Sequence, residues 1–317
     1  MLGGDGRNNQ ILLALWKAKS IKEHDIDNEV IFYVIEEPEA HLHPHQQRKL
    51  ADYLIAEIPG QTIISSHSPQ IAVNFEPDSI IRLLDRGGHT VAASEGCSKG
   101  ISDGWEDMSY RMSILPAESF FSNGVFLIEG PSEILFYHSL AKSLNIDLDY
   151  LNISLISVDG ISFKIYAAIL DALEIPWVMR TDNDVSKLKD KEKWHYAGIN
   201  RCLDIAGIEK FEHSDKKISS QDTLANGDWQ RVSDEVNRSG IYLSKIDLET
   251  DLVEELGASI LDALDKKNNQ SAIEYLQKKK AIRMRILLKK IKNDLDKLSM
   301  GDLVKPLHHL VKIVKGE

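Results

Sequence analysis

The chain has 317 residues, of which 43% are hydrophobic, and a formal net charge of −11 at pH 7. This length and hydrophobic content suffice for two domains with cores of their own. The acidic balance argues against a uniformly basic nucleic-acid-binding protein. A metal site and a local basic strip can nevertheless carry phosphate contacts. No apolar run reaches the roughly 18 residues of a transmembrane helix. The two cysteines, Cys97 and Cys202, show no metal-ligand spacing. We therefore expect a reduced, cytoplasmic protein without a membrane partner.

The first part of the chain combines a glycine-rich turn with two apolar runs that end in polar residues. The turn at 3–6 precedes apolar residues with helical spacing, and backbone N–H groups at such a turn can receive a phosphate. The run 30–35 predicts a fully buried strand that leads directly into Glu36. A second predicted buried strand begins at residue 62 and ends in His67. Taken alone, the glycine-rich turn is also compatible with an ordinary loop.

This order of motifs resembles the C-terminal half of an ABC-type ATPase head of the SMC and OLD kind. The resemblance makes the turn that contains Gly4 and Gly6 the signature motif, which contacts ATP held by a partner subunit. It implies that Glu36 stands at the Walker B position near Mg²⁺ and Glu37 at the position of the catalytic glutamate. His67 then corresponds to the switch histidine near the γ-phosphate. Two features depart from the pattern, since the Walker B acid is usually Asp and the turn lacks the usual serine.

The chain lacks the phosphate-binding P-loop that such an ATPase needs. The P-loop pattern ends in Gly-Lys, and this dipeptide occurs nowhere in the sequence. In ABC heads the P-loop precedes the signature motif, so we expect Met1 to lie inside a domain. The chain would then be a C-terminal fragment or one half of a split protein. We expect ATP to be a cofactor only in the full-length assembly, and the chain alone not to hydrolyse it.

Residues 124–184 contain apolar runs that each end in acidic side chains. One predicted strand ends at Glu129, with Glu133 one helical turn later, and another leads into Asp182 and Asp184. Short apolar runs separated by helical patterns predict a parallel α/β sheet, whose ligands bind at the carboxyl ends of the strands. The two aspartates project to the same side if the strand continues through them. Gathered carboxylates repel one another unless a hard cation such as Mg²⁺ neutralises them. The alternative is that these acids are helix N-caps.

With an intervening predicted strand and turn at 156–160, this order resembles the Toprim domain of topoisomerases, primases and OLD-family nucleases. In that pattern the glutamate after the first strand and the DxD pair after the third carry the metal ion. The resemblance therefore implies Mg²⁺ or Mn²⁺ as cofactor. It also implies that the ligands and catalytic carboxylates are Glu129, Glu133, Asp182 and Asp184.

Two further site residues follow from the same resemblance. A predicted strand at 240–244 precedes Glu249 and Asp251, and either matches the acidic residue that follows the family's fourth strand. The basic segment 278–292 is a candidate contact to phosphodiesters. Lys280, within it, is our choice for the lysine that OLD-family Toprim domains place after the acidic cluster. A solvated amphipathic helix is the equal alternative for any single lysine of this segment.

We predict an α/β protein of two domains. Residues 1–117 form the C-terminal portion of an ABC-type ATPase domain, and 118–317 form a Toprim domain with a Rossmann-like parallel sheet and helical C-terminal elements. A polar insertion with little pattern is expected at about 190–238. The first Toprim helix, over 132–144, is predicted to place His138 on its buried face.

The resemblance implies the C-terminal part of an OLD-family ATP-dependent endonuclease, similar in layout to Gabija-type phage-defence nucleases. Such a protein cuts DNA by metal-assisted phosphodiester hydrolysis. The expected partners are DNA, a second copy of the chain, and a helicase-like or other defence subunit. A topoisomerase or primase is a rival, but no DNA-gate or zinc module is visible in the sequence. The other rival is a non-catalytic SMC-like DNA clamp or regulatory ATPase subunit.

Overall fold

The structure is a computed structural model that divides into two compact units, Met1–Phe121 and Ser122–Glu317. Besides a few helical positions between 11 and 22, it describes residues 32–58, 61–75, 79–93, 117–158, 163–189 and 192–317. No helix among these residues is long and apolar enough to cross a membrane.

The first unit contains a two-stranded parallel sheet and a hairpin. Its elements are β1 (Phe32–Glu36), α2 (Pro44–Glu57), β2 (Gln61–Ser65), α3 (Pro69–Ala72), β3 (Leu83–Arg86), β4 (His89–Ala92) and the 3-10 helix η2 (Ser119–Phe121). Strands β1 and β2 are parallel, and α2 provides the crossover that parallel strands require. Strands β3 and β4 are antiparallel and turn at Gly87 and Gly88, which both have positive φ.

Only one face of the β1–β2 pair is covered in the described part of the chain. Tyr33 and Ile35 are buried, whereas Phe32 is 59% exposed, Val34 71% and Ile63 61%. The prediction of two fully buried strands is therefore wrong. Successive residues of a strand point to opposite faces, and the small apolar core that includes α2 covers only the face of Ile35.

The second unit is built on a four-stranded sheet with the order β10-β7-β5-β6. Its strands are β5 (Gly124–Ile128), β6 (Ile153–Ser157), β7 (Trp177–Thr181), β8 (Ser186–Lys187), β9 (Trp194–His195) and β10 (Ile241–Leu243). Its helices are α6 (Pro131–Ser143), α7 (Phe163–Ala172), α8 (Ala197–Ile205), α9 (Ser220–Ala225), α10 (Asp228–Val236), η3 (Asn237–Ser239), α11 (Leu248–Leu264), α12 (Asn269–Gln277), α13 (Lys280–Lys290), η4 (Leu295–Met300) and α14 (Lys305–Lys315).

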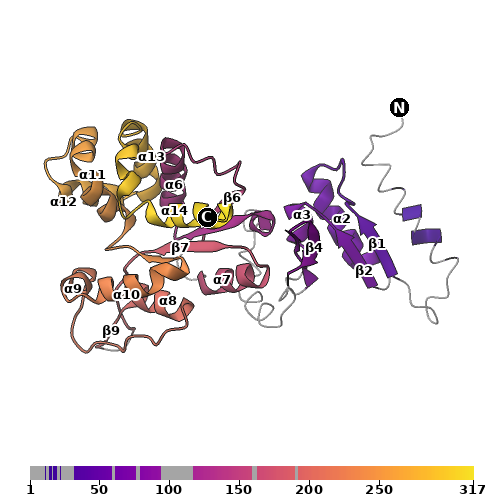
Figure 1. Cartoon of the computed structure of the whole chain (residues 1–317), viewed down its shortest axis with the longest axis horizontal. Coiled ribbons are helices and arrows are strands. Elements are labelled where there is room, and N and C mark those ends of the chain that lie inside the picture. Colours follow the sequence, from indigo (N-terminus) through magenta and orange to yellow (C-terminus); the bar gives the residue numbers. More distant parts are fainter. Residues whose placement is uncertain are drawn as a thin grey trace. The chain divides into compact units, whose positions relative to one another are not determined.

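All neighbouring strands of this sheet are parallel. Helices α6, α13 and α14 lie on one side of the sheet, and α7, α8 and α10 lie on the other (Figure 1). Strand β5 is in the interior of the sheet, and each of its residues is buried. A strand covered on both faces appears in sequence as a continuous apolar run. The prediction of an α/β fold with a parallel sheet is therefore confirmed.

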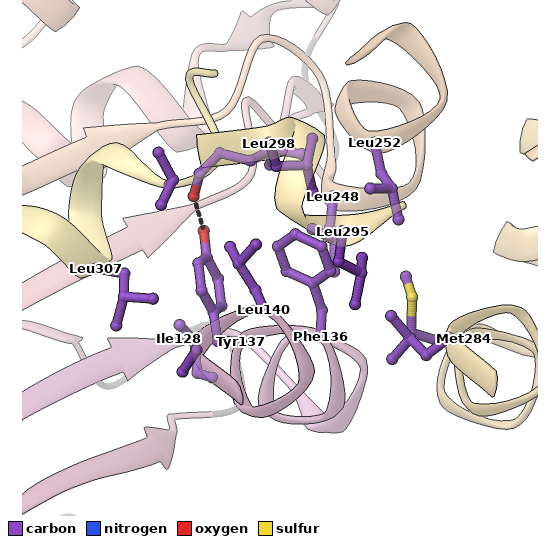
Figure 2. Close-up of a cluster of buried hydrophobic side chains, with 14 of the residues drawn as sticks. Ile128, Phe136, Tyr137, Leu140, Leu248, Leu252, Met284, Leu295, Leu298 and Leu307 are labelled. Atoms are coloured by element: carbon purple, nitrogen blue, oxygen red, sulfur yellow. Dashed lines mark hydrogen bonds between the residues drawn. The ribbon is translucent and has the colours of Figure 1, made fainter. Parts of the chain in front are cut away.

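A large apolar core joins α6 to the C-terminal helices (Figure 2). Phe136 and Tyr137 are completely buried there, together with Leu252 of α11 and Met284 of α13. The Tyr137 hydroxyl donates a hydrogen bond to the carbonyl oxygen of Leu303 at 3.1 Å. Each fully buried large apolar side chain stabilises the fold by roughly 1.5–3 kcal/mol. This core holds the N-terminal ends of α11 and α13 next to the start of α6.

Two expectations about this unit are wrong. His138 is exposed, because the buried residues of α6 lie on the opposite stripe of the helix. The insertion at 190–238 is also not without pattern, since it forms α8, α9 and α10. In α10, Val232 and Val236 are four residues apart and buried on one face. The Trp229 indole donates to the carbonyl oxygen of Ser244 at 2.8 Å, which ties this helix to the chain after β10.

Candidate active site

The site begins at the carboxyl ends of two neighbouring strands. Glu129 follows β5 and Asp182 follows β7, and these parallel strands pair with each other. The backbone N–H of Asp182 donates to Glu129 Oε1 at 2.8 Å. Strand β7 ends at Thr181, so it does not continue through the two aspartates, and their exposure differs. Asp182 is 4% exposed, whereas the side chain of Asp184 is 53% exposed.

Two elements that are distant in sequence complete one side of the cluster. Lys280, the first residue of α13, places its Nζ 3.6 Å from Asp182 Oδ2 and 3.5 Å from Glu249 Oε2. Glu249 lies in the first turn of α11 and is completely buried, and its Oε1 accepts a hydrogen bond from the Ser132 hydroxyl at 2.9 Å. The structure thus brings Lys280 and Glu249 to the acidic residues of the sheet.

Asp251 has a different environment from Glu249. It forms a buried ion pair with Arg180, with 2.7 Å between Oδ2 and Nη2. Its carboxylate also accepts hydrogen bonds from the backbone N–H groups of Lys245 at 3.1 Å and Ile246 at 3.2 Å. These contacts hold the loop after β10 and occupy the Asp251 carboxylate. They do not favour a catalytic role for Asp251, and that role stays a prediction.

The carboxylates carry more negative charge than their surroundings readily accept. Burial raises the pKa of Glu133 to about 7. Burial, followed by repulsion from Glu129, raises the pKa of Asp182 well above its ordinary range and also raises that of Asp184. Burial lowers the pKa of the Lys280 ammonium, but attraction by the carboxylates, Asp182 foremost, outweighs burial and raises it. Such a set of perturbed groups is typical of a functional site that binds cations.

Arg201, on α8, is a site residue that the sequence did not reveal. Its Nη1 lies 2.7 Å from Glu129 Oε1 and also donates to the Thr181 hydroxyl, and its Nη2 lies 3.5 Å from Asp184 Oδ2. The guanidinium reaches them because α8 begins directly against the loop after β7. A Cβ at Gly198 would lie 2.2 Å from the carbonyl oxygen of Asp182, so only glycine permits this approach. Gly198, at the start of α8, is the sequence feature that permits the contact.

The donor set fits a hard divalent cation in its chemistry. Carboxylate oxygens are the ligands that Mg²⁺ and Mn²⁺ prefer. The buried Oε2 of Glu249 accepts no hydrogen bond from the described residues. In the described part of the chain, however, no group of three or more His, Cys, Asp and Glu side chains is arranged to hold a metal ion. Arg201 and Lys280 supply positive charge instead, and the assignment of the carboxylates as metal ligands stays a prediction.

The first unit brings part of its own predicted site together. Glu36 pairs with Ser65 in the parallel register, which places the ends of β1 and β2 side by side. His67 Nε2 lies 3.6 Å from Glu37 Oε1. The roles of these residues in ATP hydrolysis stay predictions. Gly4 and Gly6 lie outside the described residues.

Comparison with protein families identifies both parts of the sequence. The model of the TOPRIM domain of overcoming lysogenization defect (OLD) protein-like proteins matches residues 120–184, from just before β5 to Asp184. The chain carries an OLD-like TOPRIM domain. A model of the AAA ATPase domain matches residues 3–72, which include Glu36, Glu37 and His67. The TOPRIM match ends before Glu249 and Lys280, which the structure nevertheless places at the carboxylates of the TOPRIM domain.

Two curated relatives are similar to most of the chain. Endonuclease GajA of Bacillus cereus strain VD045 is 26% identical over 296 residues, which are 89% of this chain and 50% of that protein. Endonuclease GajA of Bacillus cereus strain HuB5-5 is 24% identical over 251 residues, which are 62% of this chain and 34% of that protein. The chain therefore spans about half the length of the first relative and about a third of the second.

Two solved structures also match. The C-terminal region of the Burkholderia pseudomallei OLD protein has a TM-score of 0.37 and 22% identity, covering 61% of this chain and 99% of its own. The C-terminal region of the Xanthomonas campestris pv. campestris OLD protein has a TM-score of 0.35 and 23% identity, covering 62% of this chain and 96% of its own.

Proposed function

We propose that the TOPRIM domain of this chain is a metal-dependent endonuclease that hydrolyses phosphodiester bonds of DNA. The observation that supports this function best is the meeting of Glu129, Asp182, Glu249 and Lys280 at one edge of the parallel sheet. The match to an OLD-like TOPRIM domain and the endonucleases among its relatives support the same reaction class.

The residues of the site divide the chemical work. Glu129, Asp182, Asp184 and Glu133 would hold Mg²⁺ or Mn²⁺, which supplies a Lewis acid for the scissile phosphate when bound. The Lys280 ammonium lies at the same carboxylates and offsets the negative charge that develops on the phosphate in the transition state. Without a bound cation, burial raises the pKa of Glu133 to about 7, and a divalent ion at these carboxylates would lower it and favour the ionised ligand.

A basic groove beside α13, the helix that begins with Lys280, offers a contact for the DNA backbone. A cavity of about 270 Å³ lies between α6, α13 and η4. Helices α6 and α13 run side by side (Figure 1). The cavity is lined by leucines and by four cations, Lys142, Arg285, Lys289 and Lys292. Lys289 lies about 14 Å along α13 from Lys280, at 1.5 Å per residue. Clustered cations favour contact with the phosphates of DNA.

The proposed function also includes an ATPase domain, protein partners and a cellular setting. The unit with Glu36, Glu37 and His67 would belong to an ATPase domain that regulates cutting, with the P-loop supplied by the full assembly. A second copy of the chain and a helicase-like or other defence subunit are the proposed protein partners. Phage defence in the cytoplasm is the proposed setting. These points rest on the resemblance to Gabija-type nucleases.

The test is cleavage of supercoiled plasmid by the purified protein with Mg²⁺, Mn²⁺, Ca²⁺ or EDTA, with and without ATP. We expect nicked or linear plasmid with Mg²⁺ or Mn²⁺ and intact plasmid with EDTA. Plasmid that stays intact with every ion would contradict the nuclease assignment and favour the non-catalytic clamp.

A further inference from the structure

The Arg201 guanidinium lies between two carboxylates of the site. It is 2.7 Å from Glu129 Oε1 and 3.5 Å from Asp184 Oδ2, and it donates a hydrogen bond to the Thr181 hydroxyl as well. The Arg201 side chain is only 20% exposed. One guanidinium thus joins the residues that follow β5 with those that end β7.

Helix α8 holds Arg201 in this position. The Gly198 N–H donates to the carbonyl oxygen of Asp184 at 3.0 Å, which fixes the start of the helix on the loop. Asn200 exchanges two hydrogen bonds with the Phe211 backbone, at 2.8 and 3.0 Å. At the other end of α8, Asp204 pairs with two lysines. The position of α8 therefore fixes the contact of Arg201 with the carboxylates, which does not depend on one rotamer of a free surface side chain.

Glu129 Oε1 is fully engaged in this arrangement. Besides Arg201, it accepts hydrogen bonds from the Thr181 hydroxyl at 2.5 Å and from the Asp182 N–H at 2.8 Å. A carboxylate oxygen has about two lone pairs, so three donors leave no free direction for a further ligand bond. Mg²⁺ binds oxygen at about 2.0–2.1 Å, inside the space that the guanidinium occupies.

We propose that Arg201 is an internal counter-ion that competes with the divalent cation for Glu129 and Asp184. In the metal-free protein its single positive charge stabilises the carboxylates. It must leave Glu129 before a divalent ion binds to this oxygen, and the released guanidinium is then free to bind a DNA phosphate. DNA and metal ion should therefore bind cooperatively through Arg201, each raising the affinity of the other by the same factor. The inference rests on the proposed metal-dependent function.

The test measures Mn²⁺ binding by electron paramagnetic resonance without DNA, so cleavage is not the readout. We expect Arg201→Ala to lower the Kd for Mn²⁺ by about tenfold, the scale of one lost charge-assisted hydrogen bond. Lys216→Ala is the matched control, because it removes an exposed cation outside α8 that touches neither carboxylate. Its Kd should equal that of the wild type.

Further variants and conditions keep the outcomes distinct. If Arg201→Ala does not fold, Arg201→Lys retains the charge but cannot span both carboxylates, and it should bind Mn²⁺ more tightly than wild type by a smaller factor. An oligonucleotide with a non-hydrolysable backbone should tighten Mn²⁺ binding by a larger factor in wild type than in Arg201→Ala. An unchanged or raised Kd in the Arg201 variants, with wild type binding Mn²⁺ and cutting DNA, would overturn this inference alone. Absence of Mn²⁺ binding by wild type and variants would overturn the metal-dependent function together with it.

Discussion

Lys280 lies 3.6 Å from Asp182, although one residue starts α13 and the other follows β7 of the central sheet. The same ammonium is 3.5 Å from Glu249 of α11. The apolar core around Phe136 and Tyr137 makes this meeting possible, because it fixes α11 and α13 against α6. The packing of this apolar core therefore determines where the positive charge of the site lies.

We expect Lys280→Ala to lower the rate of plasmid nicking by about 100-fold, the usual effect of removing one preorganised donor to a developing anion. DNA affinity should change little, because the cations of the basic groove remain. Single-turnover nicking rates and fluorescence anisotropy separate the two effects. Lys280→Arg keeps the charge and should retain part of the rate. A loss of DNA affinity that accounts for the whole loss of rate would contradict a role in the chemical step.

Glu133 should make the metal-free protein less stable as the pH rises. Burial raises its pKa from the ordinary 4.5 to about 7, so between these values the folded state holds a proton that the unfolded state releases. Stability therefore falls across this window as pH increases. Glu133→Gln should reduce this dependence, because Asp182 and Asp184 with their raised pKa values remain, and should stabilise the protein above pH 7 by up to about 3 kcal/mol, at about 1.4 kcal/mol per pKa unit.

Urea unfolding in EDTA at pH 5 and pH 8 measures this effect. Glu254→Gln, on the exposed side of α11, is the control and should leave the pH dependence of wild type intact. The same pH dependence in Glu133→Gln and wild type would show that Glu133 does not carry a raised pKa.

Gly198→Ala should disturb both stability and the site. The new Cβ would lie 2.2 Å from the Asp182 carbonyl oxygen and 2.9 Å from the Asn183 Cα, and backbone atoms cannot yield as a side chain can. We expect a loss of about 1–3 kcal/mol, typical of overpacking. Gly257→Ala is the matched control in α11, where the nearest atom is a side-chain oxygen of Asn269 at 3.3 Å. Thermal unfolding of both variants measures the loss. A Gly198→Ala protein as stable as wild type would contradict the close contact between α8 and the backbone of residues 182–184.

The elements of the sheet were predictable from sequence, but their neighbours were not. The apolar runs before Glu129 and Asp182 mark buried strands because both faces of β5 and β7 are covered. The order β10-β7-β5-β6 depends on pairing between distant segments, which local patterns do not encode. For the same reason the exposed face of β1 was missed, since composition does not show whether a second layer covers a strand.

The carboxylates of the site were predictable and the cations only in part. The resemblance indicates Lys280, which lies at the carboxylates. It does not distinguish Glu249 from Asp251, whereas in the structure Glu249 contacts Lys280 and Asp251 pairs with Arg180. Arg201 was missed because nothing in its local sequence distinguishes it from other surface arginines. Its place depends on the close approach that Gly198 permits, which is a property of the folded chain.

The basic groove should contribute to DNA affinity through phosphate contacts. Arg285→Ala and Lys289→Ala should each weaken binding of unrelated DNA sequences alike and reduce the slope of log Kd against log salt by about one. Lys312→Ala, at an exposed position of α14, removes the same charge away from the groove. Anisotropy titrations over a salt series measure the slopes. Equal slopes for the groove variants and Lys312→Ala would show that the basic groove does not contact the DNA.

The most direct test of the nuclease centre compares plasmid cutting by wild type and Asp182→Asn with Mn²⁺. Asparagine has the shape of aspartate, so the fold and the DNA Kd should be retained within about twofold while the negative charge that holds the cation is lost. Asp234→Asn, exposed on α10, is the control and should cut like wild type. We predict that Asp182→Asn binds DNA and leaves the plasmid supercoiled. Cutting by Asp182→Asn at the wild-type rate, with contaminating nuclease excluded, would contradict the assignment of these carboxylates as the site of phosphodiester hydrolysis.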